Sequence, residues 1–245
     1  MLNTQRLYKK LECIKVHLFR QNFLFMVVPK RRFMQSQVKS KKRVRDKGEV
    51  FTNEREVNAM LDLVKQETER IDSRFLEPAC GNGNFLIEIL RRKLEVVKSR
   101  YKKSQWEYEK NGLIAVMSCY GVDIMPDNVL ECQNRLFEYF EKEYKSLFKK
   151  NIKQEYLDIV KFVLSKNILC GDALSMKTST NEPITFAEWS FVKGSLVQRR
   201  DFHYEQLLTQ NDKKETLFGD FIEKPIKTYP LTHYLNLKEN DTNDK

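Results

Sequence analysis

The sequence predicts an α/β fold built on a doubly wound, mostly parallel sheet. Short apolar runs that end at glycine, proline or aspartate alternate with longer stretches whose apolar residues recur at helical spacing. Such alternation of strands and helices is typical of parallel sheets that are covered by helices. The alternation breaks in the C-terminal third, where we expect an atypical arrangement.

Charge separates a basic N-terminal segment from the rest of the chain. The whole chain carries a net charge of +10, but residues 1–47 contain 14 lysines and arginines against two acids, so residues 48–245 are net −2. We expect residues 1–47 to form a basic N-terminal arm or extension, 48–180 to form the ligand-binding domain, and 181–245 to be an atypical segment that completes the sheet. The run "KSKKRVR" (39–45) fits either salt-sensitive contacts with nucleic-acid phosphates or a solubilising tail.

Cysteine usage and hydropathy exclude several classes of protein. The five cysteines are scattered without a C-x-x-C pair and the chain has three histidines, which argues against a disulfide framework and against a metal site. Reduced thiols and a cytoplasmic location are therefore expected. No apolar run approaches the roughly 20 residues that a membrane-spanning helix needs, so no membrane partner is expected.

The first expected unit is a helix, a strand, a glycine turn and a second helix. Asn53 is the expected N-cap of the first helix, and Glu56 stands three residues on, as in a capping box. "FLEPACGNG" (75–83) then predicts a buried strand that enters a tight turn. From Phe85 onward, apolar residues at helical spacing predict a helix that continues into a charged stretch.

Further strands and helices follow in alternation. A second strand is expected over 112–124, and then a helix from about Pro126 to Lys149, because proline suits a first helical position. A third strand is expected over 167–174, preceded by a helix. The stretch 184–192 favours another strand, and 221–237, with two prolines, favours extended chain or an edge strand.

Acidic residues follow each of the three expected strands. The carboxyl ends of parallel strands meet at one edge of a sheet, so Glu77, Asp123 and Asp172 should converge there. The turn glycines allow backbone N–H groups to approach a ligand closely. Glu77 would repel a pyrophosphate but suits an ammonium group, which favours S-adenosylmethionine over NAD or ATP. Asp123 can then accept from ribose hydroxyls and Asp172 from an adenine amino group, although any one of these acids alone would also fit a helix N-cap.

The order of four motifs resembles a known family. "GEVFTN", "FLEPACGNGNF", "YGVDIMPDN" and "ILCGDAL", within about residues 43–175, are similar to the cofactor-binding motifs of amino-methylating DNA methyltransferases of bacterial restriction-modification systems, in the adenine N6 group. The resemblance implies a class I, Rossmann-like methyltransferase fold with S-adenosylmethionine as cofactor. It also implies DNA as a partner, which this chain alone would bind non-specifically, and a restriction or specificity subunit as a further partner.

In that family the threonine of the first motif, the glycine turn and the acids after the second and third strands contact the cofactor. The matching cofactor-binding positions here are Thr52, Glu77, Pro78, Ala79, Cys80, Gly81, Asn82, Gly83, Asp123, Ile124, Asp172 and Ala173. Asn53 stands where the family usually has proline.

The family's transfer loop, [N/D/S]-P-P-[Y/F], has no counterpart, because the chain contains no Pro-Pro. In the family this loop holds the target amino group and stacks an aromatic ring on a flipped base. The remaining catalytic candidates are Asn181 in "NEPI" and Trp189, yet Asn181 fits a turn better and Trp189 fits the packed face of a strand. Arg199 and Arg200 fit phosphate contacts or a solvated surface.

Three functional interpretations follow. The first is S-adenosylmethionine-dependent methylation of adenine N6 in DNA. The second is an inactive or truncated methyltransferase-like subunit that acts by binding a partner, which the missing transfer loop favours. The third is a methyltransferase that acts on RNA or protein.

Overall fold

The computed structural model describes residues 24–25, 39–47, 49–209 and 224–242; the remainder of the basic arm lies outside the described residues. The strands are β1 (Leu24–Phe25), β2 (Phe75–Glu77), β3 (Cys119–Asp123), β4 (Ile168–Cys170), β5 (Thr185–Lys193), β6 (Leu196–His203), β7 (Lys227–Thr228) and β8 (Thr232–His233). The α-helices are α2 (Lys41–Lys47), α3 (Glu54–Asp62), α4 (Lys65–Thr68), α5 (Asn84–Tyr101), α6 (Gln105–Met117), α7 (Pro126–Phe148), α8 (Gln154–Asn167), α9 (Tyr204–Thr209) and α10 (Glu239–Thr242). Short 3-10 helices cover Lys149–Asn151 and Tyr234–Asn236.

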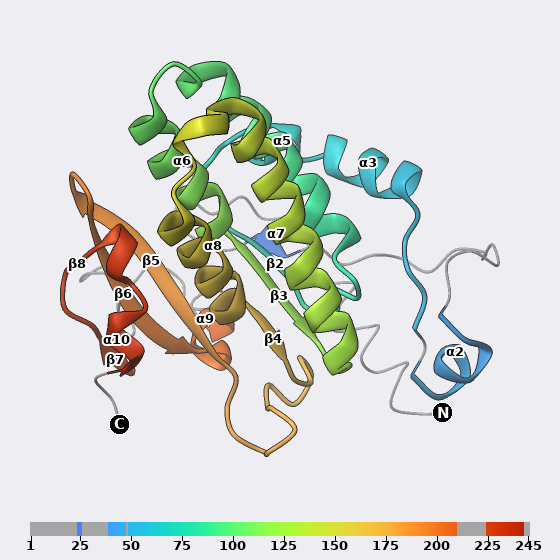
Figure 1. Cartoon of the computed structure of the whole chain (residues 1–245). Coiled ribbons are helices and arrows are strands. Elements are labelled where there is room, and N and C mark those ends of the chain that lie inside the picture. The colour runs from blue at the N-terminus through green and yellow to red at the C-terminus, as the bar shows by residue number, and fades with distance from the viewer. Residues whose placement is uncertain (1–23, 26–38, 48, 210–223, 243–245) are drawn as a thin grey trace, which may run out of the picture.

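A parallel sheet in the order β1-β2-β3-β4 forms the centre of the molecule (Figure 1). Glu77 lies opposite Gly121, and Asp123 lies opposite Cys170, so the carboxyl ends of β2, β3 and β4 share one edge. The described strands follow one another across the sheet without reversing direction. Right-handed crossovers in such a sequential order place their helices on the same face.

The two faces of the sheet are covered differently. Phe75, Cys119 and Ile168 belong to the larger core cluster, which the residues of α5 to α8 complete. Leu76 and Tyr120 point the other way and pack with residues of the β5–β6 hairpin. The second face of the described strands carries a hairpin where a doubly wound sheet would carry helices, so the doubly wound arrangement is not confirmed. What the structure does show is an α/β fold with a parallel and an antiparallel sheet.

The second sheet consists of β5 and β6 paired antiparallel, with β7 and β8 each paired to β6. The expectation that residues 181–245 complete the parallel sheet is wrong for the part that the structure describes, because these strands pair only with one another. The strand over 184–192 is confirmed as β5. Of 221–237, residues 221–223 lie outside the described part of the chain, the short strands β7 and β8 fit the edge-strand interpretation, and Tyr234–Asn236 is a 3-10 helix. The Tyr120 hydroxyl donates to the Ala187 carbonyl (3.0 Å) and ties the hairpin to the parallel sheet.

Of the two β6 arginines, Arg199 is buried and paired, whereas the Arg200 side chain stays 38% exposed. Arg199 is 4% exposed, pairs with Asp201 (2.8 Å) and Asp241 (2.6 Å), and lies 4.2 Å from the ring centroid of Tyr229. Arg200 pairs with Glu188 (2.7 Å). For Arg199 both sequence interpretations are wrong, because the side chain is buried and paired with Asp201 and Asp241.

The local predictions near the sheet are confirmed in part. The strand expected over 167–174 covers only Ile168–Cys170, and the helix expected from Phe85 onward ends at Tyr101, before α6 begins. Asn53 caps α3 by accepting from the Glu56 N–H (3.0 Å), and Pro126 is the first residue of α7. The apolar run over 112–117, predicted as strand, is the end of α6, and β3 begins only at Cys119. Gly112 in this helix lets Tyr156 and Phe140 pack closely, since an added Cβ would lie 3.2–3.3 Å from them. No helix among the described residues is long and apolar enough to cross a membrane.

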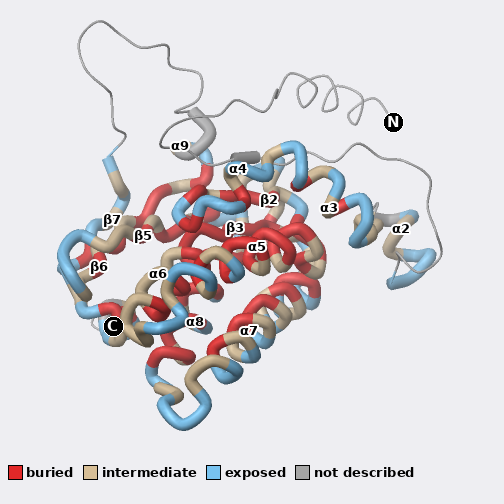
Figure 2. The backbone as a smooth tube through the Cα atoms, turned by 90° about the horizontal axis from the view of Figure 1, so that it is seen from above, coloured by how far each residue is buried: buried red, intermediate tan, exposed pale blue. Residues whose placement is uncertain are grey.

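Burial is concentrated where the sheet meets the helices. Figure 2 shows the buried stretches running through β2, β3 and α5, whereas α7 alternates buried and exposed residues along its length. The buried side of α7 therefore packs on the core while its other side is free to carry polar residues. Asn128, Glu131 and Arg135 flank the buried side and contact Asp123 or the glycine turn.

Candidate functional site at the carboxyl edge of the parallel sheet

The turn between β2 and α5 is a tight loop that requires glycine at two positions. Gly81 and Gly83 have φ angles of +52° and +89°. An added Cβ would lie 2.9 Å from the Phe51 ring at Gly81 and 2.6 Å from Cys132 Sγ at Gly83. The loop is held by Cys80 N–H donating to the Val122 carbonyl (2.9 Å). Its shape therefore depends on close packing against neighbouring segments.

Asp123, at the end of β3, contacts the glycine turn. Asp123 Oδ2 accepts from the Gly81 N–H (2.9 Å), and Asp123 Oδ1 accepts from Met125 N–H (2.8 Å) and Asn128 Nδ2 (3.2 Å). Because each carboxylate oxygen has two lone pairs, one acceptor position remains on Oδ2. Asp172 lies two residues beyond Cys170, the sheet partner of Asp123, and its Oδ1 accepts from its own loop at Leu174 N–H (2.9 Å).

Glu77 is the most unusual titratable group at this edge. Its side chain is buried, with the residue 6% exposed, and burial raises its pKa from 4.5 to about 8 despite a hydrogen bond from the Ala79 backbone. Removal from water disfavours the charged form of a carboxylate, so Glu77 is mostly protonated at neutral pH. Its Oε2 has no hydrogen-bond partner.

Unpartnered buried oxygens gather around this loop. Among the described residues, four buried side-chain oxygens form no hydrogen bond, and three of them belong to Glu49, Glu77 and Asn82. Glu49 lies next to Asp123, since Asn128 Nδ2 donates to a carboxylate oxygen of each. The Glu49 and Asn82 oxygens are acceptors, and Glu77 becomes one when it ionises; buried acceptors without a donor are costly. A ligand that is rich in hydrogen-bond donors would satisfy these acceptors.

The other predicted cofactor positions surround the loop at different depths. Cys80 is buried, Thr52, Pro78 and Ala173 are partly exposed, and Ala79 is exposed. Ile124 is 50% exposed directly after Asp123, which gives the edge an apolar patch. The Thr52 carbonyl accepts from Asn84 Nδ2 (2.7 Å), and this bond ties the first motif to the start of α5.

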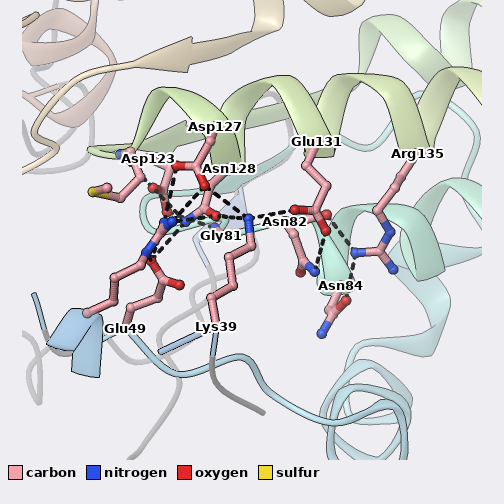
Figure 3. Close-up of polar contacts among 12 residues, drawn as sticks. Lys39, Glu49, Gly81, Asn82, Asn84, Asp123, Asp127, Asn128, Glu131 and Arg135 are labelled. Carbon is pink, nitrogen blue, oxygen red and sulfur yellow. Dashed lines mark hydrogen bonds and ion pairs between the residues drawn. The ribbon is translucent and has the colours of Figure 1, made fainter. Parts of the chain in front are cut away.

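Sequence reasoning missed a row of polar residues on α7 (Figure 3). Asn128, Glu131 and Arg135 lie on one side of the helix and each contacts the loop or its acids. Glu131 accepts from Asn82 Nδ2 (3.0 Å), and Arg135 donates to the Asn82 carbonyl (2.6 Å) and to Asn84 Oδ1 (2.9 Å). Their spacing of three and four residues would have marked them as one face of a helix.

A second missed residue is Tyr204 at the start of α9. The burial of its hydroxyl and the negative charge of Glu77 raise the pKa of Tyr204 to about 12. Tyr204 is therefore neutral at physiological pH and lies near Glu77. The sequence held no signal for this proximity, because Tyr204 begins α9 and lies 127 residues after Glu77 in β2.

The Arg135 contacts give a direct prediction. We expect Arg135→Met to lower the free energy of unfolding by about 1–2 kcal/mol, because it removes hydrogen bonds from a charged donor to the loop. Urea unfolding measures this loss. Lys142→Met, an exposed position on the same helix, should change stability by no more than about 0.5 kcal/mol. Equal stabilities of the two variants would show that α7 does not hold the loop.

The structure speaks against both catalytic candidates. Asn181 is an exposed turn residue with φ of +65°, and its Oδ1 accepts from Lys177 Nζ (3.0 Å). Trp189 is 5% exposed, donates to Asn167 Oδ1 (2.9 Å) and has Arg199 over its ring. The suggestion that Trp189 stacks on a base is wrong, because the core and Arg199 cover its ring. The turn interpretation of Asn181 is confirmed.

No group of three or more histidine, cysteine, aspartate and glutamate residues in the described part of the chain is arranged to hold a metal ion. Comparison with protein-family models, with curated proteins and with solved structures finds no match for this chain.

Proposed function

We propose that this chain is an S-adenosylmethionine-binding protein of the class I, Rossmann-like methyltransferase type. Support comes from three consecutive parallel strands with intervening helices, a glycine turn after the first of them, and an acid after each. Its resemblance to adenine N6 DNA methyltransferases rests on the order of the four sequence motifs around these features.

The observation that carries the proposal is the buried, unpartnered Glu77 oxygen at the end of β2. In the free chain Glu77 avoids the cost of a buried charge by staying protonated, and an ammonium group placed against it would stabilise its charged form instead. The methionine end of the cofactor supplies such a group. The remaining acceptor position of Asp123 and the unpartnered Glu49 oxygen suit ribose hydroxyls, and the exposed Ile124 suits an adenine ring. S-adenosylmethionine supplies a methyl group activated on a sulfonium.

We infer adenine N6 in DNA as the methyl acceptor, in keeping with the four motifs. Incubation of the purified chain with methyl-labelled cofactor and mixed-sequence duplex DNA tests this inference. Sustained incorporation of label into DNA, and not into tRNA or a protein mixture, is expected. Preferential labelling of tRNA or protein would instead support the third interpretation of the sequence.

The positions of the two catalytic candidates favour a second candidate function. With Trp189 buried, Asn181 held in a turn and no Pro-Pro in the chain, the described residues offer no loop of the family type. In this alternative the chain binds the cofactor as a subunit, and a restriction or specificity subunit completes the reaction. Cofactor binding without incorporation into any acceptor would favour it.

Binding of an ammonium group beside Glu77 should release a proton and make the ligand affinity depend on pH. Glu77 has a pKa of about 8 without ligand and is protonated at pH 6.5, and a cation beside it lowers that pKa. The bound state therefore holds fewer protons, so affinity should rise with pH between about 6 and 7. Calorimetry at pH 6.5 in buffers of different ionisation enthalpy should show release of close to one proton per ligand. Glu77→Gln should remove this release, and an unchanged proton balance in that variant would contradict the assignment.

A further inference from the structure

The described part of the basic arm is docked against the face of α7 that holds the cofactor loop. Lys39 pairs with Glu131 (2.6 Å) and Asp127 (3.2 Å). Arg43 pairs with Asp127 through both terminal nitrogens (2.6 and 3.2 Å) and with Glu49 (2.5 Å). The two basic residues thus bridge the arm, the Glu49 segment and the first turns of α7.

The acceptors of these cations are also partners of the loop. Glu131, which Lys39 contacts, accepts from Asn82 Nδ2, while Asn128 receives hydrogen bonds from Lys39 (2.8 Å) and Arg43 (3.3 Å). Asn128 in turn donates to Asp123, which accepts from the Gly81 N–H. Figure 3 shows this continuous network from Lys39 to the glycine turn.

From this network we propose that Lys39 and Arg43 act as positioning residues for the cofactor-binding loop. Together with Glu49 they form what we call the arm clasp. The clasp holds Glu131 and Asn128 in the orientation that fixes Asn82, Asp123 and Gly81. Its role for a ligand rests on the proposed function, whereas its effect on the loop does not.

The clasp should be sensitive to salt. The Asp127 and Lys39 side chains are 51% and 28% exposed, so dissolved ions screen their attraction. Lys41 and Lys42 on α2 are exposed and provide matched controls of the same charge on the same segment. Neutralising Lys39 and Arg43 changes the net charge by the same amount as neutralising Lys41 and Lys42. Of these two pairs, the bonds to α7 described above involve Lys39 and Arg43.

The experiment compares full-length Lys39→Gln/Arg43→Gln with Lys41→Gln/Lys42→Gln. Hydrogen exchange of the peptide covering 78–85 needs no ligand: we expect faster exchange in the first variant only, and faster exchange of the wild-type peptide as salt rises from about 50 to 500 mM. In S-adenosylmethionine titrations the first variant should bind about three- to tenfold more weakly at low salt and show little salt dependence. Thermal unfolding of each variant checks that the fold persists.

Two results would overturn the clasp: loop exchange in Lys39→Gln/Arg43→Gln equal to that of the wild type, or an equal change in the Lys41→Gln/Lys42→Gln control. If no form of the chain binds S-adenosylmethionine while the exchange pattern is as expected, the proposed function fails and the clasp stands. If all forms bind the cofactor equally, the clasp has no role in binding.

Discussion

Glu77→Gln is expected to weaken S-adenosylmethionine binding by about 30-fold or more, because it removes one partner of a buried charge pair that is worth at least about 2 kcal/mol. Glutamine keeps the size of the side chain and its hydrogen-bonding capacity, so the loss reports on charge. Isothermal titration of both forms measures the ratio of dissociation constants.

A truncated ligand tests whether the loss of affinity comes from the contact between Glu77 and the ammonium group. 5′-Methylthioadenosine keeps the adenosine and sulfur but lacks the amino-acid end, so Glu77 has no ammonium to contact. Wild type should bind it more weakly than S-adenosylmethionine, and Glu77→Gln should bind it about as well as wild type does. If Glu77→Gln weakens the binding of both ligands equally, the substitution has disturbed the loop and Glu77 does not contact the ammonium group.

Gly83→Ala is expected to lower the free energy of unfolding by about 2–5 kcal/mol, since it combines backbone strain with overpacking. The φ of +89° is unfavourable for alanine, and the new Cβ would lie 2.6 Å from Cys132 Sγ. Urea unfolding followed by circular dichroism measures the loss.

Two further variants separate strain from crowding. Gly194→Ala, at φ of +55° with nothing within 4 Å of an added Cβ, should lose only about 1 kcal/mol through the backbone. Cys132→Ala in the Gly83→Ala background should recover part of the loss by removing the sulfur. Equal losses at Gly83 and Gly194 would mean that the loop is not packed as tightly against α7 as described.

The parts of the fold that the sequence predicted depend on neighbours in the chain. The Asn53 cap, the start of α7 at Pro126 and the glycine turn follow from local rules about donors, φ angles and periodicity. The run over 112–117 was assigned to a strand because a short apolar segment looks alike in a buried helix and a buried strand. Burial of this segment between α5 and α8 could not be inferred from its own residues.

Long-range packing explains the larger errors. Whether helices or a hairpin cover the second face of the sheet depends on Leu76 and Tyr120 meeting Phe186 and Phe202. The burial of Arg199 depends on Asp241, 42 residues away.

Some residues of the candidate site could likewise be predicted from the sequence and others could not. Glu77, Asp123 and Asp172 could be placed together because parallel strands end at one edge. The sequence could not place Lys39, Glu131 and Arg135 at the site. Their contacts with the loop and its neighbours exist only when the arm and α7 are folded against it.

The most direct measurement is the titration of the wild-type chain with S-adenosylmethionine, alongside Asp123→Ala. The account predicts saturable binding of one ligand per chain, which Asp123→Ala weakens because Asp123 holds Gly81 and keeps an acceptor position for the ribose. Absence of saturable binding to the wild type, or binding that Asp123→Ala leaves unchanged, would contradict it.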